Sequence, residues 1–294
     1  MRDYVFKNRL LPYLLVAPTA IVVLIFFVVP AFQSLRLSFY RVNSLSGREI
    51  FVGFENFTRL LTSDEYLNSV ATTGLFILIV VFFGLSISLL LAVGASQSFR
   101  GFGVYRTLLI WPYALSPAIA GAIWALLMDP SIGPLTHGLE NIGIHFNRFT
   151  DSGHALIFIS VAATWKILGY NIVFLLAGLK NIPRDVVDAA GLDGANAWTR
   201  FWRITFPLLS PTLFFLLIMN TLYASFETFG LIDLTTQGGP GRATNVLVYK
   251  LYNDGFKNVS LLGSASAQSV LLLFMVIILT LVQYRFAGKK AFYR

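Results

Sequence analysis

The chain has 294 residues, of which 56% are hydrophobic and only 12% charged, and its formal net charge is +8. Soluble domains are about one-quarter charged, so this composition argues against a disordered chain, a nucleic-acid-binding module and an ordinary soluble enzyme. The sequence contains no cysteine, which excludes disulfides, thiolate nucleophiles and cysteine metal sites. Its 27 Phe, 12 Tyr and 5 Trp suit lipid contact and membrane-interface belts. The composition therefore predicts an integral membrane protein.

Six stretches are long and apolar enough to span a bilayer, for which about 20 residues are needed. They cover residues 11–31, 70–93, 107–128, 155–179, 208–230 and 267–284. The first follows basic residues, as a secretion signal does, but its apolar run is longer and lacks a convincing cleavage site, so we interpret it as an uncleaved signal anchor. The sequence predicts an all-α polytopic membrane protein with a transmembrane domain at 11–287, flanked by short termini at 1–10 and 288–294.

The basic residues are divided unevenly between the two sides of the predicted spans. Cytoplasmic connections are enriched in Lys and Arg, which places both termini in the cytoplasm and the longer connections 32–69, 129–154 and 231–266 outside. The inner group then comprises Arg2, Lys7, Arg9, Arg100, Arg106, Lys180, Arg184, Arg200, Arg203, Arg285, Lys289, Lys290 and Arg294. The smaller outer group comprises Arg36, Arg41, Arg48, Arg59, Arg148, Arg242, Lys250 and Lys257.

Prolines interrupt two of the predicted spans. Pro112 and Pro117 lie in the third, and Pro207 and Pro211 lie at the start of the fifth. A proline removes a backbone donor, and in lipid the freed carbonyl needs protein or water as a partner. For each proline we expect a kink that serves packing, with a contact to a water-filled pathway as the alternative.

The inner connection 182–207 has the pattern of two short helices. Pro183 favours the first turn of one helix, Gly191 and Gly194 are expected to end it, and Asp193 is a candidate cap for the next. The second helix would gather apolar side chains on one face, namely Ala197, Trp198, Phe201 and Trp202. The sequence predicts a helix–turn–helix elbow at the inner membrane surface, and on these residues alone it could be merely an amphipathic anchor.

This elbow resembles the signature E-A-A-x3-G-x9-I-x-L-P of the membrane subunits of bacterial ABC importers. The matching positions are Asp188, Ala189, Ala190, Gly194, Ile204 and Pro207, with departures at Asp188 for Glu and Phe206 for Leu. The resemblance implies that the elbow is a coupling helix that docks on a separate ATPase. The chain has no G-x-x-x-x-G-K-[ST] phosphate loop, so ATP and magnesium are expected on that partner. No cofactor, metal or catalytic residue is expected here.

Further segments resemble the carbohydrate-type, maltose-permease-like branch of these importers, and others are most similar to first permease subunits of sn-glycerol-3-phosphate importers. The former are residues 11–18, 235–244 and 247–252, and the latter are 165–166, 170–171, 182–184, 193–195 and 265–270. The resemblance implies a bacterial inner-membrane permease for sn-glycerol-3-phosphate or glycerophosphodiesters, with a neutral sugar as the alternative. It also implies a second homologous permease, an ATPase dimer and a periplasmic substrate-binding protein as partners, besides membrane lipid and without nucleic acid.

Polar residues inside the predicted spans are candidates for a substrate pathway. Lys166 lies near the middle of the fourth span, too far from either end to reach water easily, and a point cation suits phosphate. The other candidates are Tyr170, Asn171, Asn220 and Tyr223. A pair with a partner subunit's carboxylate is an equal alternative for Lys166, and interhelical hydrogen bonding is a slightly favoured one for Asn220 and Tyr223. Glu227 is expected to be solvated.

Two other classes of protein fit the sequence less well. A secondary transporter would need an internal inverted repeat and carboxylates deep in the spans, and neither is evident. An intramembrane enzyme would need a metal or nucleophile motif. The three histidines, His137, His145 and His154, share a predicted outer connection without metal-ligand spacing, so we expect exposed loop residues. The turn at residues 238–241 could face a partner or the pathway, but a plain connection explains it nearly as well.

Overall fold

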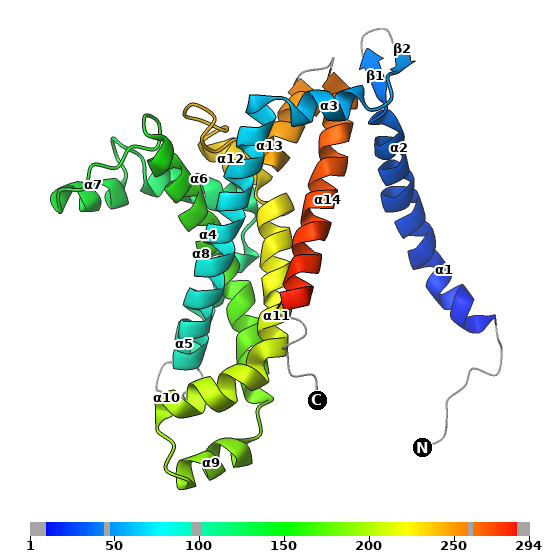
Figure 1. The fold of residues 1–294 in the computed structure, drawn as a ribbon. Coiled ribbons are helices and arrows are strands. Elements are labelled where there is room, and N and C mark those ends of the chain that lie inside the picture. The colour runs from blue at the N-terminus through cyan, green and yellow to red at the C-terminus, as the bar shows by residue number, and fades with distance from the viewer. Residues whose placement is uncertain (1–9, 44–47, 96–101, 258–260, 287–294) are drawn as a thin grey trace. The chain divides into compact units, whose positions relative to one another are not determined.

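The computed structural model describes residues 10–43, 48–95, 102–257 and 261–286, and these are mainly helical (Figure 1). The chain divides into two compact units: one comprises Met1–Ser63 and Leu251–Leu271, and the other Asp64–Lys250 and Leu272–Arg294. The residues predicted to form the elbow and the substrate pathway all lie in the second unit. The expected mainly helical, polytopic fold is confirmed, apart from one small sheet described below.

The first unit begins with a continuous helix and continues into a hairpin. Its elements are α1 (Leu11–Val23), the π-helical turn η1 (Leu24–Val28), α2 (Val29–Leu37), β1 (Tyr40–Asn43), β2 (Arg48–Phe51), α3 (Glu55–Leu61) and the π-helical turn η5 (Asn253–Lys257). The antiparallel register pairs Tyr40 with Phe51 and Asn43 with Arg48. The all-α prediction missed this hairpin because each strand has only four residues, too few for a period-two pattern to stand out from the apolar surroundings.

The second unit is a helical bundle with a broken span at one side. Its elements are α4 (Asp64–Ala95), α5 (Phe102–Ile110), η2 (Trp111–Ala114), α6 (Pro117–Leu127), α7 (Pro134–Asn141), α8 (Ser152–Lys180), α9 (Arg184–Leu192), α10 (Ala197–Arg200), η3 (Phe201–Thr205), α11 (Phe206–Leu222), η4 (Tyr223–Glu227) and α12 (Phe229–Thr235). Two more helices, α13 (Leu247–Tyr252) and α14 (Leu262–Phe286), contain residues of both units.

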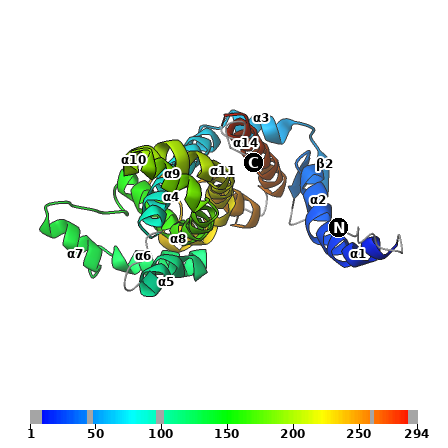
Figure 2. The same ribbon diagram turned by 90° about the horizontal axis from the view of Figure 1, so that it is seen from below.

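Helix α8 is the centre of this bundle. It packs along α4, where Ala162 and Ala163 meet Phe76 and Val80 in one buried cluster. Small side chains on α8 let the two helices approach closely, which replaces hydrophobic burial as the driving force for packing in lipid. Figures 1 and 2 show α4 and α8 running side by side through the bundle. The close packing of α4 along α8 therefore restricts the movement of α8 and of the side chains on it.

Five helices among the described residues are long and apolar enough to cross a membrane. They are Leu11–Leu37, Asp64–Ala95, Ser152–Lys180, Ala197–Glu227 and Leu262–Phe286. The predicted third span is instead two helices, Gly103–Ala114 and Pro117–Leu127, which meet at 108°. The predicted interruption at Pro112 and Pro117 is a sharp break between two helices, whereas Pro207 and Pro211 are accommodated within the helix Ala197–Glu227.

The third span breaks where two consecutive residues leave the helical conformation just before a proline. Pro117 cannot donate a hydrogen bond and disfavours helix at the residue before it. Leu115 and Ser116 are accordingly extended, and the Ser116 hydroxyl accepts from the backbone N–H of Ile119 at 3.2 Å, which caps α6. Pro112 is the second residue of the 3₁₀ turn η2, which lies just before the break. The chain thus turns sharply within the bundle instead of crossing it in one straight helix.

Candidate functional site

The elbow predicted between the fourth and fifth spans is present as α9 and α10, which lie together at one end of the bundle (Figures 1 and 2). Gly194 has a φ of +83° and turns the chain between the two helices, a conformation that glycine adopts freely. Asn196, not Asp193, caps α10: its side-chain oxygen accepts from the Thr199 N–H at 2.8 Å. Asp193 instead ends α9, and Gly191 lies inside that helix.

The elbow presents an unshielded surface. Asp188 and Ala189 on α9 are exposed and Ala190 is half-buried. Leu192, at the end of α9, is 91% exposed. The elbow therefore presents exposed apolar and acidic side chains next to one another.

The second helix of the elbow runs without interruption into a membrane-spanning helix. Residues Ala197–Glu227 form one helical unit, in which the half-buried Ile204 and Pro207 lie at the junction. The rings of Trp198 and Trp202 are 5.6 Å apart, and those of Trp202 and Phe206 are 5.0 Å apart. These edge-to-face and tilted ring contacts stiffen the junction.

Lys166 lies at the centre of the bundle beside two tyrosine rings. It is only 6% exposed, and its ammonium nitrogen is 5.5 Å from the ring centroid of Tyr223 and 5.9 Å from that of Tyr113. Within the described residues it forms no ion pair, and the carboxylate whose charge acts on it, Glu227, is exposed at the surface. The two aromatic faces offset part of the free-energy cost of burying the cation. Within the described residues, Lys166 is therefore a buried cation held mainly by aromatic faces.

Tyr113 reaches Lys166 because the broken span packs tightly on α8. A Cβ atom added at Gly169 would lie 2.7 Å from the carbonyl oxygen of Ile110, so the backbone of α5 touches α8 at this glycine. The 3₁₀ turn η2 then follows directly and places the Tyr113 ring 5.3 Å from that of Tyr170. Sequence reasoning missed Tyr113, although the two prolines that flank it, Pro112 and Pro117, marked the place.

Tyr170 starts a row of aromatic rings that leads away from the lysine. The Tyr170 and Phe174 centroids are 4.8 Å apart, and those of Phe174 and Phe215 are 5.1 Å apart. The Tyr223 hydroxyl is buried and donates to the carbonyl of Ala163 at 3.4 Å. We call Lys166, Tyr113, Tyr170 and Tyr223 the lysine–tyrosine cluster. It combines one cation with aromatic faces and phenol hydroxyls.

The two predicted asparagines form a separate contact. Each side-chain amide of Asn171 and Asn220 donates to the oxygen of the other, at 3.0 and 2.7 Å, and both residues are fully buried. A Cβ atom at Gly84 on α4 would lie 3.1 Å from the Asn220 oxygen. Three helices therefore meet at this amide pair. The geometry supports the interhelical alternative for Asn220, and Asn171 is its partner.

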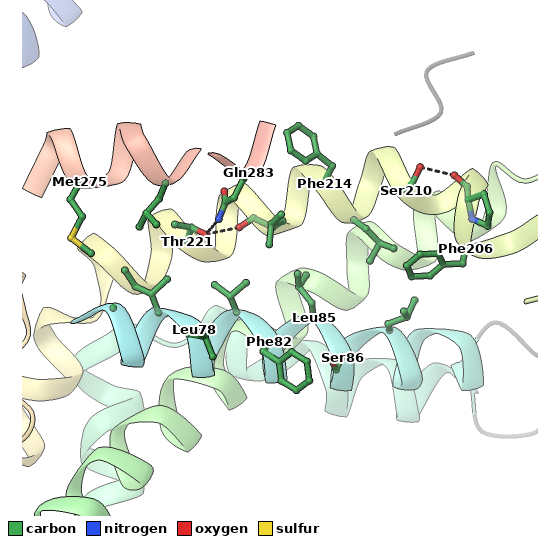
Figure 3. A pocket seen from close by; sticks show the side chains of 18 residues that line it. Leu78, Phe82, Leu85, Ser86, Phe206, Ser210, Phe214, Thr221, Met275 and Gln283 are labelled. Atoms are coloured by element: carbon green, nitrogen blue, oxygen red, sulfur yellow. Dashed lines mark hydrogen bonds between the residues drawn. The ribbon is translucent and has the colours of Figure 1, made fainter. Parts of the chain in front are cut away.

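A large groove lies elsewhere in the unit, between α4, α11 and α14 (Figure 3). It has a volume of about 850 Å³, and none of the described residues that line it is charged. Its polar contacts are internal: the Gln283 amide donates to the Thr221 hydroxyl at 2.7 Å, and the Ser210 hydroxyl donates to the Pro207 carbonyl at 2.6 Å. Among its described lining residues, the groove therefore offers no charged side chain to a phosphate.

Two of the three histidines that were expected in a loop lie on helices instead, His137 on α7 and His154 on α8. His154 stacks on Phe146 with 4.8 Å between centroids and accepts from the Asn147 N–H, whereas His137 and His145 are exposed. No group of three metal ligands occurs in the part of the chain that the structure describes. The turn at residues 238–241 is held by a residue that follows it. The Thr244 hydroxyl donates to the Thr236 hydroxyl and to the carbonyl of Gly239.

The family of binding-protein-dependent transport system inner membrane components matches residues 61–290 of this chain. The chain belongs to this family. It is 47% identical over 293 residues to the sn-glycerol-3-phosphate transport system permease protein UgpA of Rhizobium meliloti, with all of both chains covered. It is 44% identical over 290 residues to the UgpA of Salmonella typhimurium, covering 99% of this chain and 98% of the relative.

A solved structure has the same fold. The crystal structure of a bacterial ABC transporter involved in the import of the acidic polysaccharide alginate superposes with a TM-score of 0.80 and 21% sequence identity, covering 95% of both chains. The predicted membership among ABC importer permeases is thereby confirmed. The chain is a multi-pass inner-membrane permease, a transport component and not an enzyme.

Substitutions at the Asn171–Asn220 amide pair test whether these residues serve helix packing or transport. We expect Asn171→Leu and Asn220→Leu each to destabilise the permease by about 1–2 kcal/mol, because each leaves a buried amide without its partner. The double variant should lose less than the sum of the two. Thermal unfolding of the detergent-solubilised permease measures this. Strictly additive losses, or uptake lost at unchanged melting temperature, would contradict a packing role.

Proposed function

We propose that this permease is a membrane subunit of an ABC importer that moves sn-glycerol-3-phosphate or glycerophosphodiesters across the bacterial inner membrane. Its relatives at 47% and 44% identity, which match it from end to end, bear the name of that transport system. The lysine–tyrosine cluster independently supports an anionic substrate, since Lys166 is a buried cation that forms no ion pair within the described residues. The end-to-end match to these relatives is the observation that carries the proposal.

In this proposal the cluster holds the phosphate within the membrane. The Lys166 ammonium donates to phosphate oxygens, and desolvation strengthens the contact. The hydroxyls of Tyr113 and Tyr170 supply further donors, since neither ring is fully buried. The aromatic row from Tyr170 to Phe215 packs against the carbon atoms of the glycerol. That row also favours a second candidate, a neutral sugar, because sugars stack on aromatic faces.

We infer that the elbow couples the pathway to a separate ATPase, which binds ATP and magnesium. The residues concerned are Asp188, Ala189, Ala190, Gly194, Ile204 and Pro207. The support is the exposed surface of α9 and the continuous helix from Ala197 to Glu227. Rigid-body movement of the elbow by the ATPase would tilt α11. This moves η4 and thereby Tyr223, which contacts Lys166.

The proposed assembly contains a second homologous permease, two ATPase subunits and a periplasmic substrate-binding protein. One solved relative of the same fold is an alginate transporter in complex with a pentasaccharide-bound periplasmic protein. We propose that both termini and the elbow face the cytoplasm, which the excess of Lys and Arg in those connections supports. Reporter fusions at Thr199 and Asn141 test this, and an outer-side signal at Thr199 would contradict ATPase coupling.

Transport by a strain lacking its own importer tests the substrate. The permease is expressed with its neighbouring subunits, and uptake of labelled sn-glycerol-3-phosphate and labelled maltose is compared. We expect uptake of the phosphorylated substrate, reduced by excess unlabelled glycerophosphodiester and not by maltose. Uptake of maltose alone would replace the phosphate proposal with the neutral-sugar candidate. Co-purification of an ATPase from the same cells tests the importer class independently of substrate.

A substitution in the turn between α9 and α10 tests the role of the elbow in coupling. Gly194→Val should abolish most uptake while leaving membrane insertion intact, because a β-branched residue is strained at a φ of +83°. The strain should be about 1–2 kcal/mol, enough to redirect α9. Uptake and ATPase recovery are measured at matched expression.

The matched control for Gly194 is Gly191→Ala in the same elbow. Gly191 lies within α9, and a Cβ atom there would meet only the flexible end of the Arg200 side chain, at 3.4 Å. Alanine also favours helix over glycine, so we expect normal uptake. If Gly194→Val transported as well as this control, the elbow would have no part in coupling.

A further inference from the structure

The β1–β2 hairpin of the first unit exposes large apolar side chains. Ile50, Phe51 and Phe54 are 57%, 68% and 69% exposed. We call these three residues the hairpin patch. Neighbouring residues of a strand point to opposite faces, so Ile50 and Phe51 make both faces of β2 apolar. A fluid medium such as lipid can cover both faces of a strand more readily than a single rigid protein partner can.

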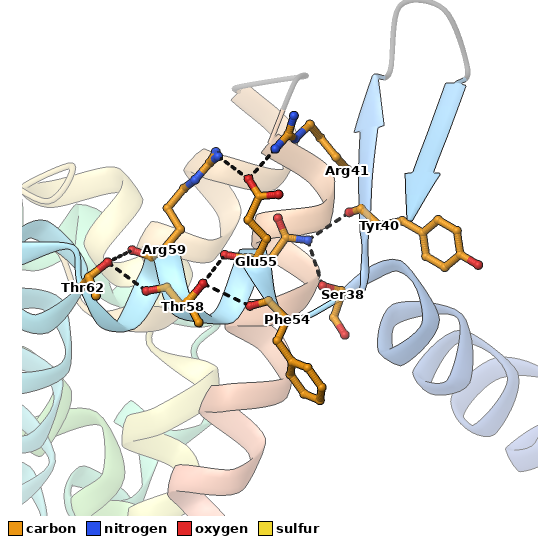
Figure 4. Close-up of polar contacts among 9 residues, drawn as sticks. Ser38, Tyr40, Arg41, Phe54, Glu55, Thr58, Arg59 and Thr62 are labelled. Atoms are coloured by element: carbon orange, nitrogen blue, oxygen red, sulfur yellow. Dashed lines mark hydrogen bonds and ion pairs between the residues drawn. The ribbon is translucent and has the colours of Figure 1, made fainter. Parts of the chain in front are cut away.

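The hairpin patch is held in place by buried polar contacts. The Asn56 amide, buried under the hairpin, donates to the carbonyl of Ser38 at 2.8 Å and to that of Tyr40 at 3.0 Å (Figure 4). A Cβ atom at Gly263 would lie 2.0 Å from the Tyr40 carbonyl oxygen, so α14 packs directly against β1. The unit therefore presents its apolar groups on a fixed frame.

The charges around the hairpin are paired within the same unit. Glu55 bridges Arg41 and Arg59, the latter at 2.9 Å, and Arg36 pairs with Glu49 (Figure 4 shows the Glu55 bridge). The Arg36 guanidinium also lies 5.1 Å from the ring centroid of Tyr40. Paired charges beside exposed aromatic rings suit the boundary between lipid headgroups and hydrocarbon, where amphipathic groups concentrate.

The length of the preceding helix places the hairpin at that depth. The helix Leu11–Leu37 has 27 residues, which span about 40 Å at 1.5 Å per residue. A bilayer is about 40–45 Å thick including its headgroups. Only Ser38 and Phe39 separate this helix from β1. The hairpin therefore begins where the chain reaches the headgroup layer, and the exposed apolar surface of α2 continues into it.

We propose that the hairpin patch inserts into the headgroup–acyl boundary of the lipid bilayer and sets the depth of the first span. The occupant of the patch is bilayer lipid and not another protein. Charged headgroups then meet Arg41, Glu55 and Arg59 on one side, while Ile50, Phe51 and Phe54 contact the upper acyl chains. This inference is independent of the transported substrate.

The cysteine-free sequence makes the proposal directly testable by site-specific labelling. Ile50→Cys, Phe51→Cys and Phe54→Cys each receive a nitroxide label, and the full permease is reconstituted in nanodiscs, alone and with its co-purified subunits. Collision with lipid-soluble oxygen is compared with collision with a water-soluble nickel chelate. Thr62→Cys, an exposed polar position just after α3, is the matched control.

We expect oxygen to dominate over the nickel chelate at least twofold at all three patch positions, with the opposite order at Thr62, both alone and in the complex. Dominance of the nickel chelate at the patch would place it in water and overturn the proposal. Labels protected from both reagents in the complex would also overturn it, because the patch would then be a protein–protein interface. Circular dichroism confirms that each variant remains folded.

Discussion

Lys166→Met should reduce uptake of sn-glycerol-3-phosphate about tenfold to a hundredfold, because a charge-assisted hydrogen bond contributes about 1.5–3 kcal/mol. The variant removes the ammonium group but retains an unbranched side chain between the rings of Tyr113 and Tyr223. Lys166→Arg should retain more uptake than Met, though less than the native chain, since its planar fork does not reproduce a point cation. Uptake is measured at equal amounts of membrane-inserted permease.

The control for this prediction is Lys180→Met, at the exposed end of the same helix, which should transport normally. Recovery of the assembled complex is measured in parallel. Should Lys166→Met lose the complex as well as uptake, the lysine pairs with a partner subunit instead of the substrate. Full uptake by an intact Lys166→Met complex would remove this residue from phosphate recognition, although the importer class would stand.

Gly169→Val should destabilise the permease and eliminate uptake, because its Cβ would lie 2.7 Å from the Ile110 carbonyl oxygen and 3.0 Å from its Cα. Both atoms belong to the backbone, which cannot move aside as a flexible side chain does. Overpacking a core costs about 1–3 kcal/mol of stability. We expect a loss near the upper limit of this range, because the contact is with backbone atoms. The displaced helix α5 would also carry η2 and Tyr113 away from Lys166.

Gly94→Val on α4 is the matched control, since nothing lies within 4 Å of a Cβ atom at that exposed position. Its melting temperature and uptake should remain close to those of the native permease. Melting temperature and uptake are compared for both variants in the same preparation. Native values for Gly169→Val would show that the broken span does not depend on this contact.

Local patterns carried the prediction of the membrane helices and the elbow. An apolar run of about 20 residues is sufficient to specify a span. Four of the six predicted stretches lie within long helices, and a fifth, 208–230, overlaps a helix that ends at Glu227. The elbow was predictable because Gly194 and the proline before α9 act on their own backbone neighbourhood. Even there, spacing could not decide between Asp193 and Asn196 as the cap, because both residues are suitable acceptors one turn ahead of an N–H.

The lysine–tyrosine cluster depended on contacts between distant segments. Lys166 was identifiable alone, since a cation in mid-span is costly wherever the neighbours lie. Tyr113 was not, because its position follows from a 108° break and from the backbone contact at Gly169, more than fifty residues away in the chain. The pairing of Asn171 with Asn220 likewise required the packing of α8 on α11. The sequence alone therefore determined five of the six spans, the elbow and the buried cation, because each depends on local composition. Tertiary packing decided which side chains surround that cation, because only packing brings separate helices to one point.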